Sequence, residues 1–245
     1  MNLPEYERMF EVEETQWWFV GMRALSFALL DGAARGGVAH GRKILDAGCG
    51  TGSNLKHLAS RGSAVGIDIA DEALRFCRAR GVTVARAGLL GLPFPDACFD
   101  WVTSFDVLYH RWVTDDRLAM KELARVVRPG GLVLVRVPAL KMLWGAHDET
   151  VHSRHRYTRG EVVALLEQAG LVVERASYAN TLLFPLVLAR RAFDRLTGRH
   201  GSDIGVLPAP LEWAFRSALL LESRILRHAS LPVGASVFAL GRKPQ

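Results

Sequence analysis

Short runs of apolar residues alternate with helical patterns over residues 43–137 of the chain. The runs carry apolar side chains at consecutive positions and are flanked by glycine, which is typical of strands buried on both faces of a parallel sheet. This alternation predicts an α/β fold built on a doubly wound sheet. The expected strands in this part are Lys43–Asp46, Ala64–Asp68, Val82–Val84, Phe99–Thr103 and Leu132–Val137.

Helical patterns surround this core on both sides in the sequence. Residues 1–40 have a helical pattern and precede the first strand, so we expect a helical N-terminal cap. Two more strands are expected at Leu171–Tyr178 and Ser236–Leu240, and the segment between them far exceeds an ordinary loop. We therefore expect one domain over 1–245, with a cofactor-binding core at 41–180, a helical insertion at 181–230 and the final strand within 231–245.

Composition and charge narrow the class of protein. The 245 residues are 49% hydrophobic and 23% charged, as in soluble globular proteins. Residues 180–245 carry nine basic and four acidic side chains, which is +5 of the total +6, so this region can attract an anion or simply be a solvated helix face. The chain shows neither an 18-residue apolar run nor a secretory signal pattern, which predicts no transmembrane segment and a cytoplasmic location. Its three cysteines have no metal-site or disulfide spacing.

A glycine-rich turn follows the first strand. Asp46-Ala47-Gly48-Cys49-Gly50-Thr51-Gly52 leads into a helix, and the second strand ends in Asp68, where a carboxylate can accept both hydroxyls of a ribose. A dinucleotide and an adenosyl cofactor both bind at such turns. Asp46 would repel a pyrophosphate but suits the ammonium end of an amino acid, which favours S-adenosylmethionine.

Two further segments resemble the class I S-adenosylmethionine-dependent methyltransferases. Leu92–Asp100 is similar to that family's LPFPDxSFD segment, and Arg125–Gly131 is similar to its RxLxPGG turn. The resemblance covers at least 43–180. It implies a Rossmann-like sheet of seven strands, the last antiparallel, and S-adenosylmethionine as the cofactor.

A narrower resemblance, to bacterial methyltransferases with a tryptophan-rich N-terminus, rests on Gln16–Arg23 and His152–Thr158. Trp17, Trp18 and Phe19 can close over the cofactor or pack as a helix on the sheet edge. Many family members have an Asp near the end of the third strand where this chain has Gly88, leaving the backbone amide of Leu89 to bind adenine. The cofactor residues implied are Asp46, Ala47, Gly48, Cys49, Gly50, Gly52, Asp68, Ile69, Gly88, Leu89, Ser104, Phe105, Trp18 and Arg23.

Candidates for the acceptor side follow the fourth and fifth strands. We expect His110, His152 and Tyr157 to be catalytic, because a general base for methyl transfer must lie near the acceptor and take up its proton. Asp106 and His110 have a spacing that can bind a metal, but Tyr109 stands where resembling metal-dependent enzymes have an acid, so no metal is expected. An Asn/Asp-Pro-Pro-Tyr/Phe motif is missing after the fourth strand, which disfavours methylation of nucleic-acid bases of that type.

These observations predict a methyltransferase that acts on a small organic acceptor, at oxygen, with no nucleic acid as partner. The 181–230 insertion is compatible with a hydrophobic, anionic or lipid-linked acceptor. Two alternatives stay open: a protein that binds S-adenosylmethionine without transferring its methyl group, and a membrane-surface enzyme that uses 181–230 as an interfacial anchor. Catalysis by proximity alone is also compatible with the sequence, and the oligomeric state is open.

Overall fold

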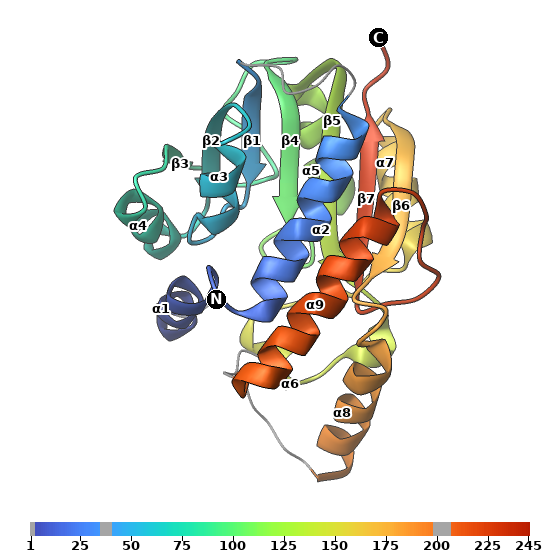
Figure 1. The fold of residues 1–245 in the computed structure, drawn as a ribbon. Helices are drawn as coiled ribbons and strands as arrows, with labels where there is room; N and C mark the ends of the chain where they lie inside the picture. The colour runs from blue at the N-terminus through green and yellow to red at the C-terminus, as the bar shows by residue number, and fades with distance from the viewer. Residues whose placement is uncertain (1–2, 35–40, 198–206) are drawn as a thin grey trace.

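The computed structural model describes residues 3–34, 41–197 and 207–245 and has a seven-stranded sheet at its centre (Figure 1). The strand order is β3-β2-β1-β4-β5-β7-β6, and β7 runs antiparallel to both of its neighbours. The predicted Rossmann-like sheet with an antiparallel last strand is therefore confirmed. The strands are β1 Lys43–Ala47, β2 Ser63–Asp68, β3 Val84–Arg86, β4 Phe99–Phe105, β5 Val127–Pro138, β6 Val172–Ala179 and β7 Ser236–Arg242.

Helices cover both faces of the sheet. One core contains side chains of α5 and α7 together with Val133, Val135 and Val137 of β5, and the other packs Leu132 and Leu134 of the same strand against α2 and α9. Alternate side chains of a strand point to opposite faces, which is why β5 is apolar at consecutive positions. The helices are α1 Leu3–Val12, α2 Trp17–Ala33, α3 Ser53–Leu58, α4 Asp71–Ala79, α5 Asp116–Val126, η1 Lys141–Leu143, α6 Ala146–Thr150, α7 Arg159–Gln168, α8 Phe184–Thr197 and α9 Ala209–Leu226.

The expected N-terminal cap and the expected insertion come together in one layer. Helices α2 and α9 lie side by side across one face of the sheet (Figure 1). A Cβ on Gly21 would overlap the side chain of Leu219, so this close approach requires glycine at position 21. At the start of α2, the Trp17 ring packs edge-on against Phe215 with centroids 5.2 Å apart, and the Trp17 amide donates to the Glu212 carboxylate.

The observed boundaries differ from the expected ones at the fifth strand, which begins at Val127 rather than Leu132, and at the third strand. We expected it at Val82–Val84, whereas β3 pairs with β2 through Val84–Arg86. Parts of the predicted cap and insertion, 35–40 and 198–206, lie outside the described residues. Among the helices that the structure describes, none combines the length and apolar character needed to cross a membrane.

Candidate active site

The glycine-rich turn after β1 is held tightly to β2. The amides of Gly48 and Cys49 both donate to the carbonyl of Ile67, each at 2.8 Å. Gly48 has φ +85°, and a Cβ there would overlap the side chain of Val107, so the turn can approach the loop after β4 only with glycine at this position.

Asp68 lies at the end of β2 beside this turn. Its carboxylate accepts hydrogen bonds from the amide of Gly50 at 3.0 Å and from the amide of Ala70 at 2.9 Å. Burial raises the pKa of Asp68 above its usual range, although these two bonds act in the opposite direction. The side chain is thus held in one orientation toward the turn.

A space next to Asp68 suits a flat aromatic ring. Ile69 is 51% exposed although it is a large apolar residue, and Leu89 is buried on the neighbouring segment. Among the described residues, a Cβ placed on Gly88 would meet only the Cδ1 atom of Ile69, at 3.9 Å. Glycine at position 88 therefore leaves open space beside Ile69.

Asp46 lies beneath the turn rather than on its surface. It is 1% exposed and accepts a hydrogen bond from the Thr103 hydroxyl at 2.8 Å. Burial raises the pKa of Asp46 to about 7, against the lowering effects of the Thr103 bond and the Arg136 charge. This carboxyl group can therefore change its protonation state when a cation binds above it.

A cavity of about 1220 Å³ begins at the turn and extends to the loops after β4 and β5. This volume is several times that of a small ligand pocket, so the cavity has room for a cofactor and an acceptor together. Of the expected cofactor residues, those that line it are Gly48, Cys49, Gly50, Asp68, Ile69, Gly88, Leu89, Phe105 and Trp18. The other expected cofactor residues are not part of the lining: Asp46, Ala47, Gly52, Ser104 and Arg23.

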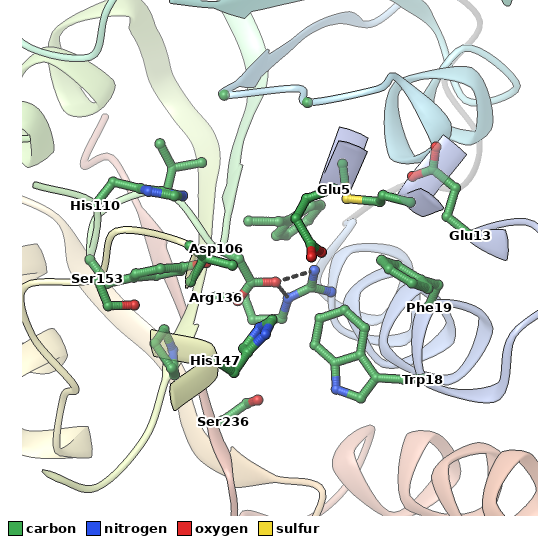
Figure 2. Close-up of a pocket in the computed structure, with 18 of the residues that line it drawn as sticks. Glu5, Glu13, Trp18, Phe19, Asp106, His110, Arg136, His147, Ser153 and Ser236 are labelled. Atoms are coloured by element: carbon green, nitrogen blue, oxygen red, sulfur yellow. Dashed lines mark hydrogen bonds and ion pairs between the residues drawn. The ribbon is translucent and has the colours of Figure 1, made fainter. Parts of the chain in front are cut away.

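The N-terminal segment closes one side of this cavity and is bonded to the glycine-rich turn. Glu13 is buried, accepts a hydrogen bond from the Thr51 hydroxyl, and pairs with Arg80 at 2.6 Å. Arg23 donates to the hydroxyl of Ser53, the first residue of α3, at 2.5 Å. Arg23 thus positions the start of α3 and is not part of the cavity lining. Trp18 and Phe19 reach the cavity from α2 (Figure 2).

An ion pair that the sequence analysis missed lies at the centre of the cavity wall. Arg136 of β5 donates through Nε to Asp106 at 2.8 Å (Figure 2). Arg136 is 4% exposed, and its guanidinium lies 5.4 Å from the ring centroid of Trp18 and 5.1 Å from that of Phe105. The signal for this pair in the sequence was the one charged residue, Arg136, inside the apolar run Leu132–Val137 of β5.

Asp106 also has an unusual backbone. Its φ is +58°, a left-handed conformation that is uncommon outside glycine and is tolerated best by Asn and Asp. Such strain concentrates at functional sites. This turn directs the Asp106 side chain back toward Arg136 at the point where β4 ends.

His110 is the expected catalytic residue that lines the cavity. Its ring stacks on Tyr109 with centroids 4.5 Å apart. Burial lowers the pKa of His110 to about 4, and a hydrogen bond with the backbone of Val151 offsets only part of that effect. The imidazole is therefore neutral at physiological pH, and its buried Nδ1 atom has no hydrogen-bond partner.

His152 and Tyr157, the other two expected catalytic residues, are placed outside the cavity lining. Tyr157 is 1% exposed, and its hydroxyl donates to Asp116 at 2.6 Å and lies 3.1 Å from the Leu108 carbonyl. His152 has φ +57° and packs edge-on against Trp112. Both residues fix the loops that carry His110.

Comparisons with known proteins find similarity to methyltransferases. Residues 45–135 match a methyltransferase domain family. A probable S-adenosylmethionine-dependent methyltransferase of Mycolicibacterium smegmatis is 35% identical over 169 residues, which are 67% of this chain and 62% of that protein. A tRNA (carboxymethyluridine(34)-5-O)-methyltransferase of Arabidopsis thaliana is 36% identical over 48% of this chain and 28% of that protein. The chain thus spans less than two thirds of the length of each of these relatives.

A solved structure agrees on the fold. The SAM-dependent methyltransferase from Thermotoga maritima has a TM-score of 0.60 to this chain, covers 98% of it and 95% of its own length, and is 19% identical. The sheet order and the glycine-rich turn with Asp68 are similar to those of S-adenosylmethionine-dependent methyltransferases. Enzymes of this class use S-adenosylmethionine as their cofactor.

Proposed function

We propose that this chain transfers the methyl group of S-adenosylmethionine to an oxygen atom of a small organic acceptor. The observation that carries the proposal is the single cavity, which joins the turn and Asp68 on one side to Asp106, Arg136 and His110 on the other. Two reactants bound in one cavity are held for direct transfer, and positioning alone supplies a large part of the rate enhancement in such reactions.

The cofactor half of the cavity fits S-adenosylmethionine, which supplies an activated methyl group on a sulfonium sulfur. Asp68 would accept the ribose hydroxyls, Ile69 and Gly88 would enclose adenine, and the Leu89 amide would bond it. Asp46 would balance the positive charge of the amino-acid end from beneath the turn. Trp18 and Phe19 would pack over the cofactor from α2 and exclude water.

The acceptor half of the cavity would provide a base. His110 is neutral over the physiological range, and the Val151 bond leaves Nδ1 to accept a proton. As the acceptor oxygen gains the methyl group, its proton would pass to His110 Nδ1, and the sulfur would keep the electron pair of the broken carbon–sulfur bond. The Arg136–Asp106 pair would fix the loop after β4, and His152 and Tyr157 would support it.

A small molecule suits this cavity better than a nucleic acid does. The carboxylates of Glu5 and Glu72 line it and would repel a phosphate backbone. The arginines in the lining are already paired with carboxylates. The tRNA relative makes nucleic acid the competing acceptor, and comparing methyl transfer to bulk tRNA and to a small-molecule library would decide between them.

The role of His110 can be tested by single-turnover methyl transfer, followed as formation of S-adenosylhomocysteine with a library-derived acceptor. We expect His110→Ala to reduce the chemical rate by roughly 10²–10⁴-fold while the dissociation constant of S-adenosylmethionine stays near that of the wild type. The matched control is His228→Ala, at a site beyond the end of α9. A His110→Ala rate equal to the wild-type rate would remove His110 as the base, and absence of any transfer with bound cofactor would favour a non-catalytic binding protein.

A further inference from the structure

Buried polar atoms without a hydrogen-bond partner concentrate in the wall of the cavity. Leaving the arginines aside, five such atoms belong to cavity-lining side chains among the residues that the structure describes, and leaving a buried polar atom unbonded is costly. Native structures contain few of these atoms, so their concentration at one cavity indicates groups that a ligand completes. The five atoms are Glu5 Oε2, His110 Nδ1, His147 Nδ1, Ser153 Oγ and Asn180 Oδ1.

Most of these residues surround the acceptor half. His110 and Ser153 form an isolated antiparallel bridge, and His147 lies nearby on α6. Figure 2 shows His110, Ser153, His147 and Ser236 around the Arg136–Asp106 pair, on the side away from Glu13 and Phe19. Asn180 follows β6, where Ala179 pairs with Ser236 of β7. Together they form a polar end of the cavity, which we call the head site: His110, His147, Ser153, Asn180 and Ser236.

The charges around the head site indicate what it binds. Each arginine in the cavity lining has a carboxylate within 4.0 Å: Arg136 has Asp106, Arg156 has Asp148, and Arg190 and Arg191 share Asp194. An anionic group at Arg136 or Arg156 would have to compete with that arginine's own carboxylate. The Asn180 Oδ1 atom can only accept a hydrogen bond, so a ligand must bring O–H or N–H donors to it. A neutral group with several hydroxyls meets both conditions.

The wall next to the head site is apolar. Leu183 directly precedes α8, and Leu186 and Val187 lie on α8 three and four residues further along the chain. The three side chains therefore share one helix face, and that face lines the cavity. Phe215 of α9 also lines it and packs against Trp17. This wall can bury a hydrocarbon group that continues from a ligand in the head site.

We propose that the methyl acceptor is an uncharged amphiphile, with a hydroxyl-rich head in the head site and a hydrocarbon portion along Leu183, Leu186 and Val187 of the α8 wall. This inference rests on the proposed function and adds the chemical class of the acceptor. One of the head hydroxyls would be the oxygen that receives the methyl group, next to His110.

The probe for this inference is octyl β-D-glucoside, kept below its critical micelle concentration and titrated by calorimetry into the full chain saturated with S-adenosylhomocysteine. Octyl sulfate and octylammonium have the same tail with an anionic or a cationic head, and glucose has the head without the tail. We expect octyl glucoside to bind more tightly than each of the other three. Tighter binding of octyl sulfate or octylammonium would overturn the uncharged head, and equal binding of glucose would overturn the tail wall.

Two variants locate the probe in the cavity. Ser153→Ala removes a hydroxyl without a partner, and we expect it to weaken octyl glucoside about fivefold, as one neutral hydrogen bond does. Leu186→Ser, at an exposed position on the α8 wall, should weaken it to a similar extent. The control is Ser223→Ala, whose hydroxyl already donates to the Leu220 carbonyl of its own helix. Variants that bind octyl glucoside like this control would overturn the inference.

The same titrations separate this inference from the proposed function. Binding of S-adenosylhomocysteine is measured first for each protein. If it binds and octyl glucoside shows no preference, only the acceptor class is wrong. If S-adenosylhomocysteine itself does not bind, the proposed function fails and the inference fails with it.

Discussion

Arg136 on β5 and Asp106 after β4 form a charged pair whose Nε–Oδ2 distance is 2.8 Å, at the carboxyl ends of two neighbouring parallel strands. Arg136 is packed against the rings of Trp18, Phe105 and Phe238. A guanidinium so enclosed depends on its carboxylate partner, because removing one member of a buried pair leaves an uncompensated charge. The pair therefore ties the acceptor loop to the centre of the sheet.

Asp106→Asn should destabilise the fold by about 2–3 kcal/mol, since it leaves the Arg136 charge without its counter-ion while Asn still tolerates the left-handed backbone. Urea unfolding measures the change. The matched control is Asp71→Asn in the exposed Arg86–Asp71 pair, which should change stability by no more than about 1 kcal/mol. Equal effects of the two substitutions would show that the Arg136–Asp106 pair contributes no more than a surface pair.

Asp68→Ala should weaken S-adenosylmethionine binding by about 1.5–3 kcal/mol, because it removes a charged acceptor that the Gly50 and Ala70 amides hold in place. Calorimetric titration gives the dissociation constant. Asp96→Ala removes a carboxylate that precedes β4, pairs with Arg125 and is not part of the cavity lining, so it should leave cofactor affinity unchanged. An unaltered dissociation constant for Asp68→Ala would contradict the assigned ribose site.

Cofactor affinity should rise with pH because of Asp46. Its pKa in the free protein is raised to about 7, so the carboxyl group is largely protonated at pH 6 and ionised at pH 8. A positively charged amino-acid end favours the ionised form, so binding should release a proton and strengthen about tenfold between pH 6 and pH 8. Calorimetry in buffers of different ionisation enthalpy measures the proton release.

The control for that experiment is the Asp46→Asn variant. The amino group of the ligand titrates in the same way in measurements on this variant and on the wild type. We expect the variant to lack the part of the pH dependence that comes from the protein. If wild type and Asp46→Asn change in parallel from pH 6 to pH 8, Asp46 does not sense the cofactor.

Gly21→Ala should destabilise the protein by about 1–3 kcal/mol, because the added methyl group would overlap Leu219 where α2 crosses α9. Gly32→Ala in the same helix is the matched control: a Cβ there meets nothing within 4 Å among the described residues, so the substitution should be neutral or stabilising by up to about 1 kcal/mol. Thermal or urea unfolding compares the two. A neutral Gly21→Ala would contradict the close packing of these helices.

The sheet and the glycine-rich turn could be predicted from the sequence because both depend on local patterns. Apolar runs such as Leu132–Val137 specify buried strands, and glycine at position 48 is required by one backbone turn. The third strand was displaced by two residues because β3 is short and half-exposed, so its apolar pattern was weak.

The acceptor side was harder to predict because it depends on contacts between distant loops. Tyr157 looked suited to catalysis from its neighbours in sequence, yet the Ala139–Tyr157 bridge places its hydroxyl on Asp116 of α5. Arg136 was overlooked because it lies within a strand, and its partner Asp106 is 30 residues away in the chain. Only the folded arrangement brings these two together.

The most direct test of the account is a crystal structure of the chain with S-adenosylhomocysteine bound. We predict that the ribose hydroxyls will bond the Asp68 carboxylate, that adenine will lie between Ile69 and Gly88, and that the sulfur will face the compartment formed by Asp106, Arg136 and His110. A ligand bound elsewhere, or one whose sulfur points away from that compartment, would contradict the claim that cofactor and acceptor meet in this cavity.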